Sequence, residues 1–160
     1  MNITPTDLAA RLRENPDLAA ANRQMLEPQP VTPVTVQGDS EHDAQVAVFQ
    51  WIDANMDRYP ALRTAFAVPN GGHRFAATAG KLKREGVRAG VPDMFVLSPR
   101  AHAGNLYHGL AIELKVGKNK PTEAQVRWIS DLRYFGYMAI VCWGAQAAID
   151  TIKHYLEIDE

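Results

Sequence analysis

The chain has 160 residues, of which 46% are hydrophobic and 22% are charged, and its formal net charge is −1. This length and composition are typical of one ordinary globular domain. No apolar stretch approaches the length of a membrane span, and the N-terminus lacks the basic and apolar regions of a signal peptide. The single cysteine, Cys142, excludes an internal disulfide, so we expect a cytoplasmic protein.

The charge is distributed unevenly along the chain. Residues 69–120 carry nine Lys/Arg against three Asp/Glu, whereas residues 1–68 carry five against nine and residues 121–160 carry three against six. A basic region of this kind is typical of a surface that contacts phosphates, although a solvated helix face is the plainer explanation for any single cation in it.

The first 38 residues predict an arm outside the main domain. Residues 1–27 are expected as one or two short helices, since Thr4, Pro5 and Asp7 resemble an N-cap, a first helical residue and a first-turn acid. Residues 28–38 contain three prolines among alternating Val and Thr, which favours an extended linker. Nothing in the arm indicates chemistry, and docking on the core, DNA contact and a dimer interface all stay open for it.

The expected domain, residues 39–160, begins with a helix. Asp39 and Ser40 open this helix, which is predicted to reach about residue 58. Glu41 stands in its first turn, where the helix dipole favours a carboxylate by about 0.3–1 kcal/mol.

A strand and a second helix are predicted next. Residues 62–68 are expected as the strand, ending in a Pro-Asn-Gly-Gly turn whose glycines permit left-handed dihedrals and close backbone approach. His73 and Arg74 follow this turn and are well placed to meet a phosphate, although His73 is equally explained as a surface histidine. With no second histidine nearby, His73 is not expected to bind a metal. Residues 75–85 are expected as the helix.

Two short apolar segments, residues 91–97 and 106–116, each predict a strand because they are rich in branched and aromatic residues and are bounded by Gly, Pro and Ser. The loop of residues 98–105 has the right length to join them as neighbours. Pro92 has no amide proton and fits the first position of a strand, which sets Asp93 at the mouth of the first segment.

The second of these strands carries two charges on one side. Glu113 and Lys115 share a face, because side chains alternate along a strand. Such a pair is most often a solvated ion pair, but these two interrupt an otherwise buried pattern, where charges are seldom kept without a partner. If the strands pair, Asp93 approaches Glu113.

Two carboxylates about 4 Å apart repel by about 4 kcal/mol at an effective dielectric of about 20. A hard divalent cation such as Mg²⁺ compensates this repulsion and leaves positions for water and substrate phosphate. Lys115 beside it would steer or deprotonate a metal-bound water, or neutralise charge on a pentavalent phosphorus. The pattern therefore predicts metal-dependent hydrolysis of a phosphodiester.

The last third of the domain predicts a polar turn, a helix, a strand and a closing helix. The turn is residues 117–120, and the first helix is residues 121–135, where Thr122 and Gln125 fit a capping box. Residues 137–143 are apolar on both faces, which predicts an interior strand covered by helices on each side. Residues 144–156 are expected as the closing helix.

Four motifs together resemble the VRR-NUC family, a branch of the PD-(D/E)xK nuclease superfamily. They are P-N-G-G-H-R at residues 69–74, G-V-P-D at 90–93, I-E-L-K at 112–115 and T-E-A-Q at 122–125. They follow the family's order, and the similarity spans roughly residues 41–156. The resemblance implies an α/β fold with a restriction-endonuclease-like core, in which a central mixed β-sheet of about four strands is flanked by helices. Here an N-terminal helical arm precedes that core.

The resemblance also implies a metal site. Asp93 and Glu113 would hold Mg²⁺ or Mn²⁺, with the backbone carbonyl of Leu114 as a further ligand, and Lys115 would activate or position the attacking water. No organic cofactor is expected.

Two supporting residues carry both a plain and a functional interpretation. Glu41 matches a glutamate that faces the metal site in the family and is counted among the expected metal ligands, against its plainer interpretation as a helix-capping charge. Gln125 matches a glutamine that orients water or the lysine, against a purely local capping role.

The expected activity is a metal-dependent DNA endonuclease. Short members of the family resemble phage-type enzymes that cut branched DNA such as Holliday junctions, which implies a homodimer, since two symmetric cuts need two sites related by a two-fold axis. The implied location is the cytosol of a bacterium or of a phage-infected host. The expected DNA contacts are His73, Arg74, Lys81, Lys83, Arg88, Lys118 and Lys120.

Two alternatives remain open. A general or nicking DNA nuclease would use the same site on different substrates, and a nucleic-acid-binding module would keep the fold without turnover. A small-molecule hydrolase is disfavoured, because the sequence offers no nucleophile elbow and no dinucleotide-binding loop.

Overall fold

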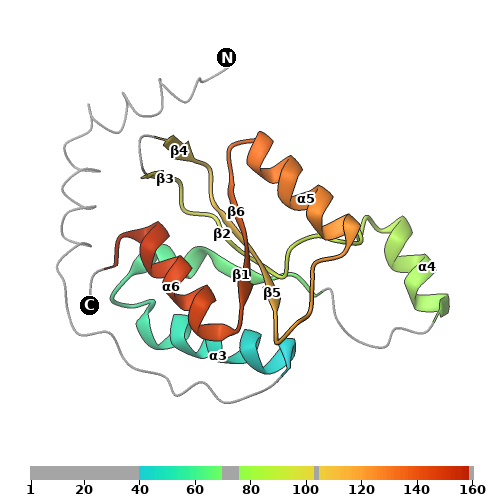
Figure 1. The fold of residues 1–160 in the computed structure, drawn as a ribbon, viewed down its shortest axis with the longest axis horizontal. Helices are drawn as coiled ribbons and strands as arrows, with labels where there is room; N and C mark the ends of the chain where they lie inside the picture. The colour runs from blue at the N-terminus through green and yellow to red at the C-terminus, as the bar shows by residue number, and fades with distance from the viewer. Residues whose placement is uncertain (1–39, 70–75, 103–104, 159–160) are drawn as a thin grey trace.

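The computed structural model describes residues 40–69, 76–102 and 105–158 of the chain (Figure 1). The predicted N-terminal arm, His73 and Arg74 lie outside these residues. None of the helices within the described ranges combines the length and the apolar character needed to cross a bilayer.

The elements of the described residues follow one another in this order: α3 (Glu41–Asn55), the 3-10 helix η1 (Pro60–Thr64), β1 (Ala65–Ala67), α4 (Ala76–Arg84), β2 (Met94–Val96), β3 (Arg100–His102), β4 (Asn105–Tyr107), β5 (Leu110–Lys115), α5 (Glu123–Tyr134), β6 (Met138–Trp143) and α6 (Ala145–Leu156).

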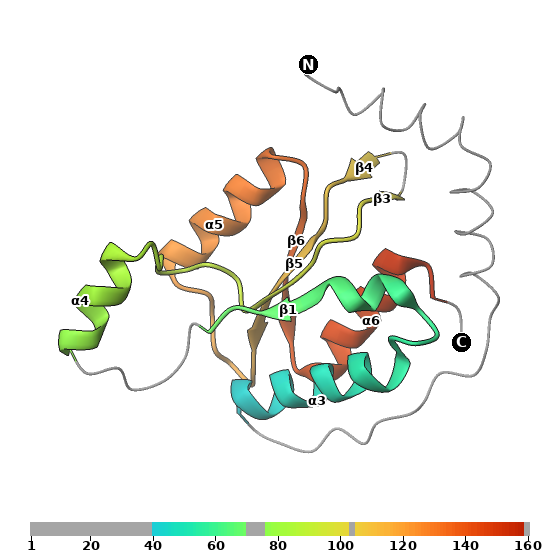
Figure 2. The ribbon, with the colours of Figure 1, turned by 180° about the vertical axis from the view of Figure 1, so that it is seen from behind.

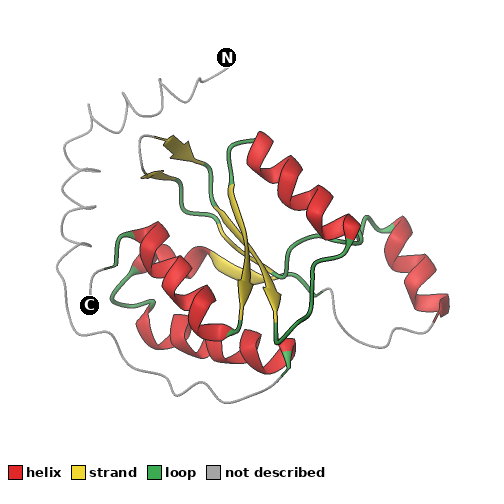
Figure 3. Cartoon of the chain, in the orientation of Figure 1, coloured by secondary structure: helices red, strands yellow, loops and turns green. Residues whose placement is uncertain are grey.

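The main sheet is mixed and has four strands in the order β1-β2-β5-β6. The pairs β1–β2 and β2–β5 are antiparallel, and β5 pairs with β6 in parallel. Helix α5 makes the crossover between the two parallel strands, as parallel neighbours require. The predicted mixed sheet of about four strands flanked by helices is confirmed (Figure 3).

Helices cover both faces of this sheet. Helices α3 and α6 lie side by side on one face, and α5 lies on the other (Figures 1 and 2). Strand β5 serves both layers because its side chains alternate. Leu110 and Ile112 belong to the large core cluster with α3 and α6, whereas Ala111 packs in a smaller cluster with Ile129 of α5.

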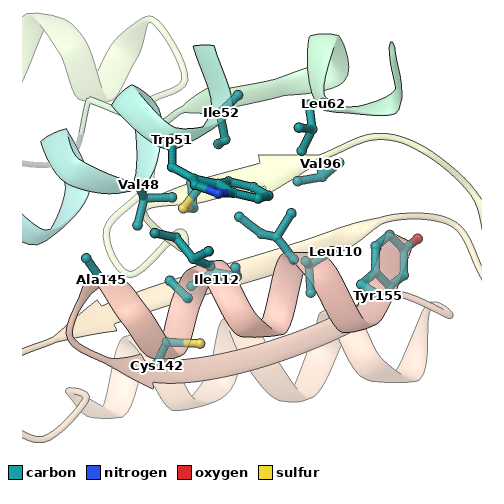
Figure 4. Close-up of a cluster of buried hydrophobic side chains, with 14 of the residues drawn as sticks. Val48, Trp51, Ile52, Leu62, Val96, Leu110, Ile112, Cys142, Ala145 and Tyr155 are labelled. Atoms are coloured by element: carbon teal, nitrogen blue, oxygen red, sulfur yellow. The ribbon is translucent and has the colours of Figure 1, made fainter. Parts of the chain in front are cut away.

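The large core forms between α3, β5 and α6. Figure 4 shows Trp51 of α3, Ile112 of β5 and Tyr155 of α6 among its buried side chains. Burying an aliphatic or aromatic side chain of this size contributes about 1.5–3 kcal/mol. This packing holds both ends of β5 in place, including the end that carries the charged residues.

Helix α3 begins where the sequence predicted. The Ser40 hydroxyl accepts a hydrogen bond from the Asp43 amide at 3.1 Å, which caps the helix. The helix ends at Asn55, three residues before the predicted end, and Asn55 Nδ2 donates to the Trp51 carbonyl at 2.7 Å.

The predicted strand over residues 62–68 is wrong in its first half. Pro60 begins a 3-10 helix that runs to Thr64, and only Ala65–Ala67 pair with the sheet. Proline fits the start of such a helix because its fixed dihedral suits the first turn and its missing amide proton has no partner there. Leu62 is buried from this turn rather than from a strand.

Two further predictions need correction. Residues 98–105 are not only a connecting loop, because β3 and β4 form a separate two-stranded sheet there.

Strand β6 is not interior but lies at the edge of the main sheet. Its two apolar faces reflect the covering helices α5 and α6, which pattern alone does not distinguish from an interior position. Arg133 Nε donates to the Ala139 carbonyl of this strand at 2.8 Å.

Candidate active site

The antiparallel register of β2 and β5 brings the two predicted carboxylates together. Met94 pairs with Ile112, and continuing this register by one residue sets Asp93 opposite Glu113. Directly opposed residues have Cβ atoms about 4.5–5.5 Å apart. Asp93 Oδ2 also accepts a hydrogen bond from the Leu114 amide at 2.9 Å, which fixes its carboxyl against β5.

Glu113 and Lys115 are both buried, with 0% and 5% of their surfaces exposed. The Lys115 ammonium donates to Glu113 Oε1 at 2.6 Å and to the Leu114 carbonyl at 2.7 Å. It also lies 3.4 Å from Oε2 of Glu41, at the start of α3. All three protons of the ammonium therefore have an oxygen partner, and one carboxylate comes from the helix layer.

These contacts shift the ionisation of the buried groups. The pKa of Glu113 is raised to about 7. Burial is the largest cause and the charge on Asp93 acts in the same direction, whereas the hydrogen bond from Lys115 opposes the change. Burial also raises the pKa of Asp93, while the hydrogen bond from the Leu114 amide opposes that change. Burial opposes protonation of Lys115, but its neighbours Glu113, Glu41 and Asp93 raise its pKa above the usual 10.5. Lys115 is therefore an ammonium at neutral pH.

Gln125 forms the capping contact that the sequence predicted, and the other end of its side chain contacts Glu113. Its Oε1 accepts a hydrogen bond from the Thr122 amide at 2.8 Å, and the Thr122 hydroxyl accepts from the Gln125 amide at 3.3 Å, which completes a capping box. Its Nε2 donates to Oε1 of Glu113. One amide side chain has a donor end and an acceptor end, so capping α5 and contacting Glu113 are compatible.

Two residues that hold Glu41 in place were not predicted from the sequence. Asn119 Nδ2 donates to Oε1 of Glu41 at 3.1 Å, and Trp143 Nε1 donates to the Asn119 carbonyl at 3.0 Å. Asn119 lies in the predicted polar turn after β5, but its partner is 78 positions away. No local pattern signals a contact of that kind.

The residues present fit a hard divalent cation. Oε2 of Glu113 is buried and has no hydrogen-bond partner among the described residues, although a buried carboxylate oxygen normally has one. Asp93 and the Leu114 carbonyl add oxygen donors beside it, and oxygen is the donor that Mg²⁺ and Mn²⁺ prefer.

Only part of a coordination shell is available from carboxylates. Within the described ranges, no three His, Cys, Asp or Glu side chains gather as a ligand cluster. Both oxygens of Glu41 contact other groups, namely Lys115 and Asn119. A shell of two carboxylates completed by water and phosphate is the usual arrangement for Mg²⁺.

Several of the predicted basic residues are exposed on segments connected to this site. Lys118 and Lys120 are exposed in the turn after β5, at the end where Lys115 lies. Lys83 and Arg88 are exposed at the end of α4 and in the loop that leads to Asp93. Lys81 of α4 lies 3.8 Å from Glu85, the first residue after this helix, which partly neutralises its charge.

Two comparisons with known proteins agree with this geometry. The family model for the VRR-NUC domain matches residues 35–146. A solved structure named "VRR_NUC domain protein" is 31% identical to the chain and superposes on it with a TM-score of 0.62. The aligned region covers 78% of this chain and 93% of that protein. No curated protein matches the chain.

The family match spans most of the described domain and includes both carboxylates, the lysine and the glutamine. PD-(D/E)xK nucleases generally use divalent metals, in keeping with the oxygen donors found here. The chain therefore belongs to the VRR-NUC domain family, nucleases of the PD-(D/E)xK type with a restriction-endonuclease-like fold.

Proposed function

We propose that this chain is a Mg²⁺- or Mn²⁺-dependent endonuclease that hydrolyses phosphodiester bonds in DNA. The observation that carries the proposal is Glu113, a fully buried carboxyl beside Asp93 and the Lys115 ammonium, with one oxygen that has no hydrogen-bond partner among the described residues. Burying a carboxylate lowers the stability of the folded protein unless a cation or hydrogen-bond donors compensate its charge.

In this proposal Asp93, Glu113 and the Leu114 carbonyl hold the metal. A bound divalent cation would polarise the scissile phosphate and lower the pKa of a coordinated water. Glu113 has to lose its proton before it binds a cation, and its raised pKa makes that loss occur near neutral pH. Glu41, the fourth expected ligand, contacts the Lys115 ammonium at 3.4 Å and would support the site from the start of α3.

Lys115 and Gln125 would position the reacting groups. Because the pKa of Lys115 is raised, its ammonium donates hydrogen bonds and does not accept a proton at neutral pH. We therefore assign it to orienting the attacking water and to neutralising charge that develops on the phosphate. Gln125 would keep the Glu113 carboxylate in a single orientation through its Nε2 contact.

The proposed substrate is branched DNA, such as a Holliday junction, cut by a homodimer. The preference for branched DNA and the dimer are what the family resemblance implies, and the exposed cations on segments connected to the site support a polyanionic substrate. Lys81, Lys83, Arg88, Lys118 and Lys120 are the proposed phosphate contacts, together with His73 and Arg74, which lie outside the described residues.

The test compares cleavage of matched duplex, single-stranded, flap and four-way-junction DNA in Mg²⁺, Mn²⁺ or chelator. We expect cleavage only with metal, most rapid on branched DNA, and lost in both Asp93→Asn and Glu113→Gln. Equal rates on all duplex forms would favour the general or nicking nuclease. Binding without cleavage under every condition would favour the non-catalytic module.

A further inference from the structure

A groove of about 890 Å³ opens beside the proposed active site. It lies between α4, the loop over residues 85–93 and the first turn of α5; Figures 1 and 2 both show α4 standing beyond that end of α5. Gln125 lines this groove and at the same time contacts Glu113. The groove is therefore separated from the buried Glu113 carboxyl by the side chain of Gln125.

The wall of the groove is fixed to α5. Gly90 has a φ of +83°, and a Cβ at that position would lie 2.6 Å from the Ala124 backbone carbon. Trp128 Nε1 of α5 donates to the Ala89 carbonyl of the loop at 3.1 Å. These two contacts keep the loop and the first turn of α5 in one arrangement, so the groove has a defined position relative to the site.

The same loop is also joined to α4. Helix α4 ends in a Schellman motif, in which the Gly86 amide donates to the Lys83 carbonyl at 3.3 Å and the Val87 amide to the Leu82 carbonyl at 3.0 Å. Arg88 Nη1 lies 3.5 Å from the same Lys83 carbonyl. The cations at the end of α4 and in the loop are therefore held at one edge of the groove.

The charge of the groove is entirely positive. Lys83, Arg84 and Arg88 line it and are exposed, and no carboxylate occurs among its described lining residues. None of the three forms an ion pair within the described part of the chain, in contrast to Lys81, which lies outside the groove. Exposed cations grouped along one groove are suited to contact the phosphates of a nucleic acid strand.

Part of the lining of the groove is apolar. Leu82, Val87 and Val91 contribute it, and Val87 keeps 41% of its surface exposed. The outside of a duplex offers phosphates and sugars but hides the faces of its bases, so it has no group to place against such a surface. An unpaired strand presents base faces and phosphates together. The volume also suits a ligand of one or two nucleotides rather than a double helix.

We propose that this groove receives an unpaired segment of the DNA strand next to the scissile phosphate, with its bases against Leu82 and Val87 and its phosphates at Arg84 and Arg88. This inference rests on the proposed nuclease function, since the ligand is part of that substrate. It specifies that function further: the enzyme selects DNA in which a strand leaves the duplex beside the cut.

The first test measures binding in chelator, so that no cleavage occurs. A short labelled oligothymidylate and a labelled duplex of the same length are titrated with the wild type, Arg84→Gln and Arg88→Gln. Each variant should weaken single-strand binding about tenfold, as loss of a charged hydrogen bond predicts, and duplex binding less than about twofold. The slope of log affinity against log salt for the single strand should fall by about 0.7 for each variant. Arg63→Gln is the matched control, because Arg63 is exposed, lies outside the groove and pairs with Asp57.

A second test blocks the groove without altering its charge. A Cβ at Gly80 of α4 meets no atom within 4 Å, and Gly80 lines the groove. Gly80→Leu should therefore weaken single-strand binding about tenfold by occupying the space, whereas Gly80→Ala should bind as the wild type does. Both substitutions favour the helix relative to glycine, so loss of folding would not explain a difference between them.

The outcomes separate this inference from the proposed nuclease function. A wild type that cuts DNA, with groove variants that bind the single strand unchanged or lose both ligands equally, overturns the groove proposal alone. A wild type that cuts nothing with any metal, with groove variants that lose only single-strand binding, supports the groove and overturns the nuclease.

Discussion

Glu113 has no exposed surface, yet it contacts an ammonium, an amide and a second acid. Its pKa of about 7 follows from burial, which outweighs the stabilising hydrogen bond from Lys115. A buried acid that ionises near neutral pH is found at functional sites more often than in structural ion pairs. A pKa near neutrality is compatible with the proposed exchange of the Glu113 proton for a metal ion.

This pKa makes stability depend on pH in the metal-free protein. Between an unfolded value of about 4.5 and a folded value of about 7, the folded protein holds a proton that the unfolded chain has released. The free energy of unfolding therefore falls as pH rises through this window, by at most about 1.4 kcal/mol per pH unit for one group. Asp93 has a raised pKa as well and contributes with the same sign.

Glu113→Gln should remove most of this dependence. Measured by urea denaturation in chelator, the variant should gain stability relative to the wild type as pH rises from 5 to about 7, and the difference should then level off. A difference between the two proteins that does not change with pH would contradict the assigned environment of Glu113.

The two roles of Gln125 can be separated through its capping partner. Thr122→Ala removes the hydroxyl that caps α5 but leaves the Nε2 contact with Glu113, so it should cost about 1 kcal/mol of stability and leave the rate of the folded enzyme unchanged. Gln125→Ala removes both contacts and should lower stability and rate together.

Denaturation curves and single-turnover cleavage rates measure these effects. Equal rate losses in the Thr122 and Gln125 variants would show that Gln125 acts only through the cap.

At the level of single residues, the sequence predicted those site members whose positions follow from local pattern. Asp93 follows from a proline at the start of a strand, and Glu113 and Lys115 follow from strand alternation. Asn119 and Trp143 were missed because their contacts depend on how α3, the turn after β5 and the end of β6 meet in space.

Among the elements, the loop between α4 and β2 determines how the site is assembled. It carries Asp93 at one end and touches α5 through Gly90, so it joins the edge of the sheet where the metal is proposed to bind to the helix that carries Gln125. The glycine is required there both by its positive φ and by the short distance to Ala124.

Gly90→Ala should therefore destabilise the protein more than a glycine substitution at a position where only the positive φ opposes a side chain. Gly86 has a φ of +101° and open space around its Cβ position, so Gly86→Ala is the matched control. We expect about 1 kcal/mol of destabilisation for Gly86→Ala. Gly90→Ala should lose more stability, and its cleavage rate should also fall because Asp93 and the groove wall move. Equal losses in both variants would show that the contact with Ala124 is unimportant.

The elements predicted correctly are those with a long periodic pattern or a clear cap, such as α3, α5 and α6. The failures concern short segments. Leu62 is buried from a 3-10 helix, although the apolar residues around it are spaced as in a strand. Strands β3 and β4 have three residues each, too few to show the alternation of a strand. The edge position of β6 depends on sheet order, which its own residues do not encode.

For the whole molecule, the distribution of charge matters more than its total. The net charge is −1, yet residues 69–120 carry an excess of cations, and several of them are exposed on α4, on the loop that follows it and in the turn after β5. The molecule is thus able to bind a polyanion locally without being basic overall.

DNA binding should accordingly weaken steeply with salt. Each phosphate contact with duplex DNA contributes a slope of about −0.9 in log affinity against log salt. The double variant Lys118→Gln/Lys120→Gln should reduce the slope by up to about 1.8 without changing the folded structure, because both side chains are exposed. Fluorescence anisotropy in chelator measures this slope, and a flat salt dependence in the wild type would argue against the proposed surface.

The central claim is that Asp93 and Glu113 share one divalent cation. Crystals of the wild type soaked in Mn²⁺ and measured near the manganese absorption edge test it most directly. The account predicts one anomalous peak between the two side chains, about 2.1 Å from a carboxylate oxygen of each, and no such peak in Glu113→Gln. A wild-type crystal in which manganese binds elsewhere, or leaves these two carboxyls without a shared ion, would contradict it.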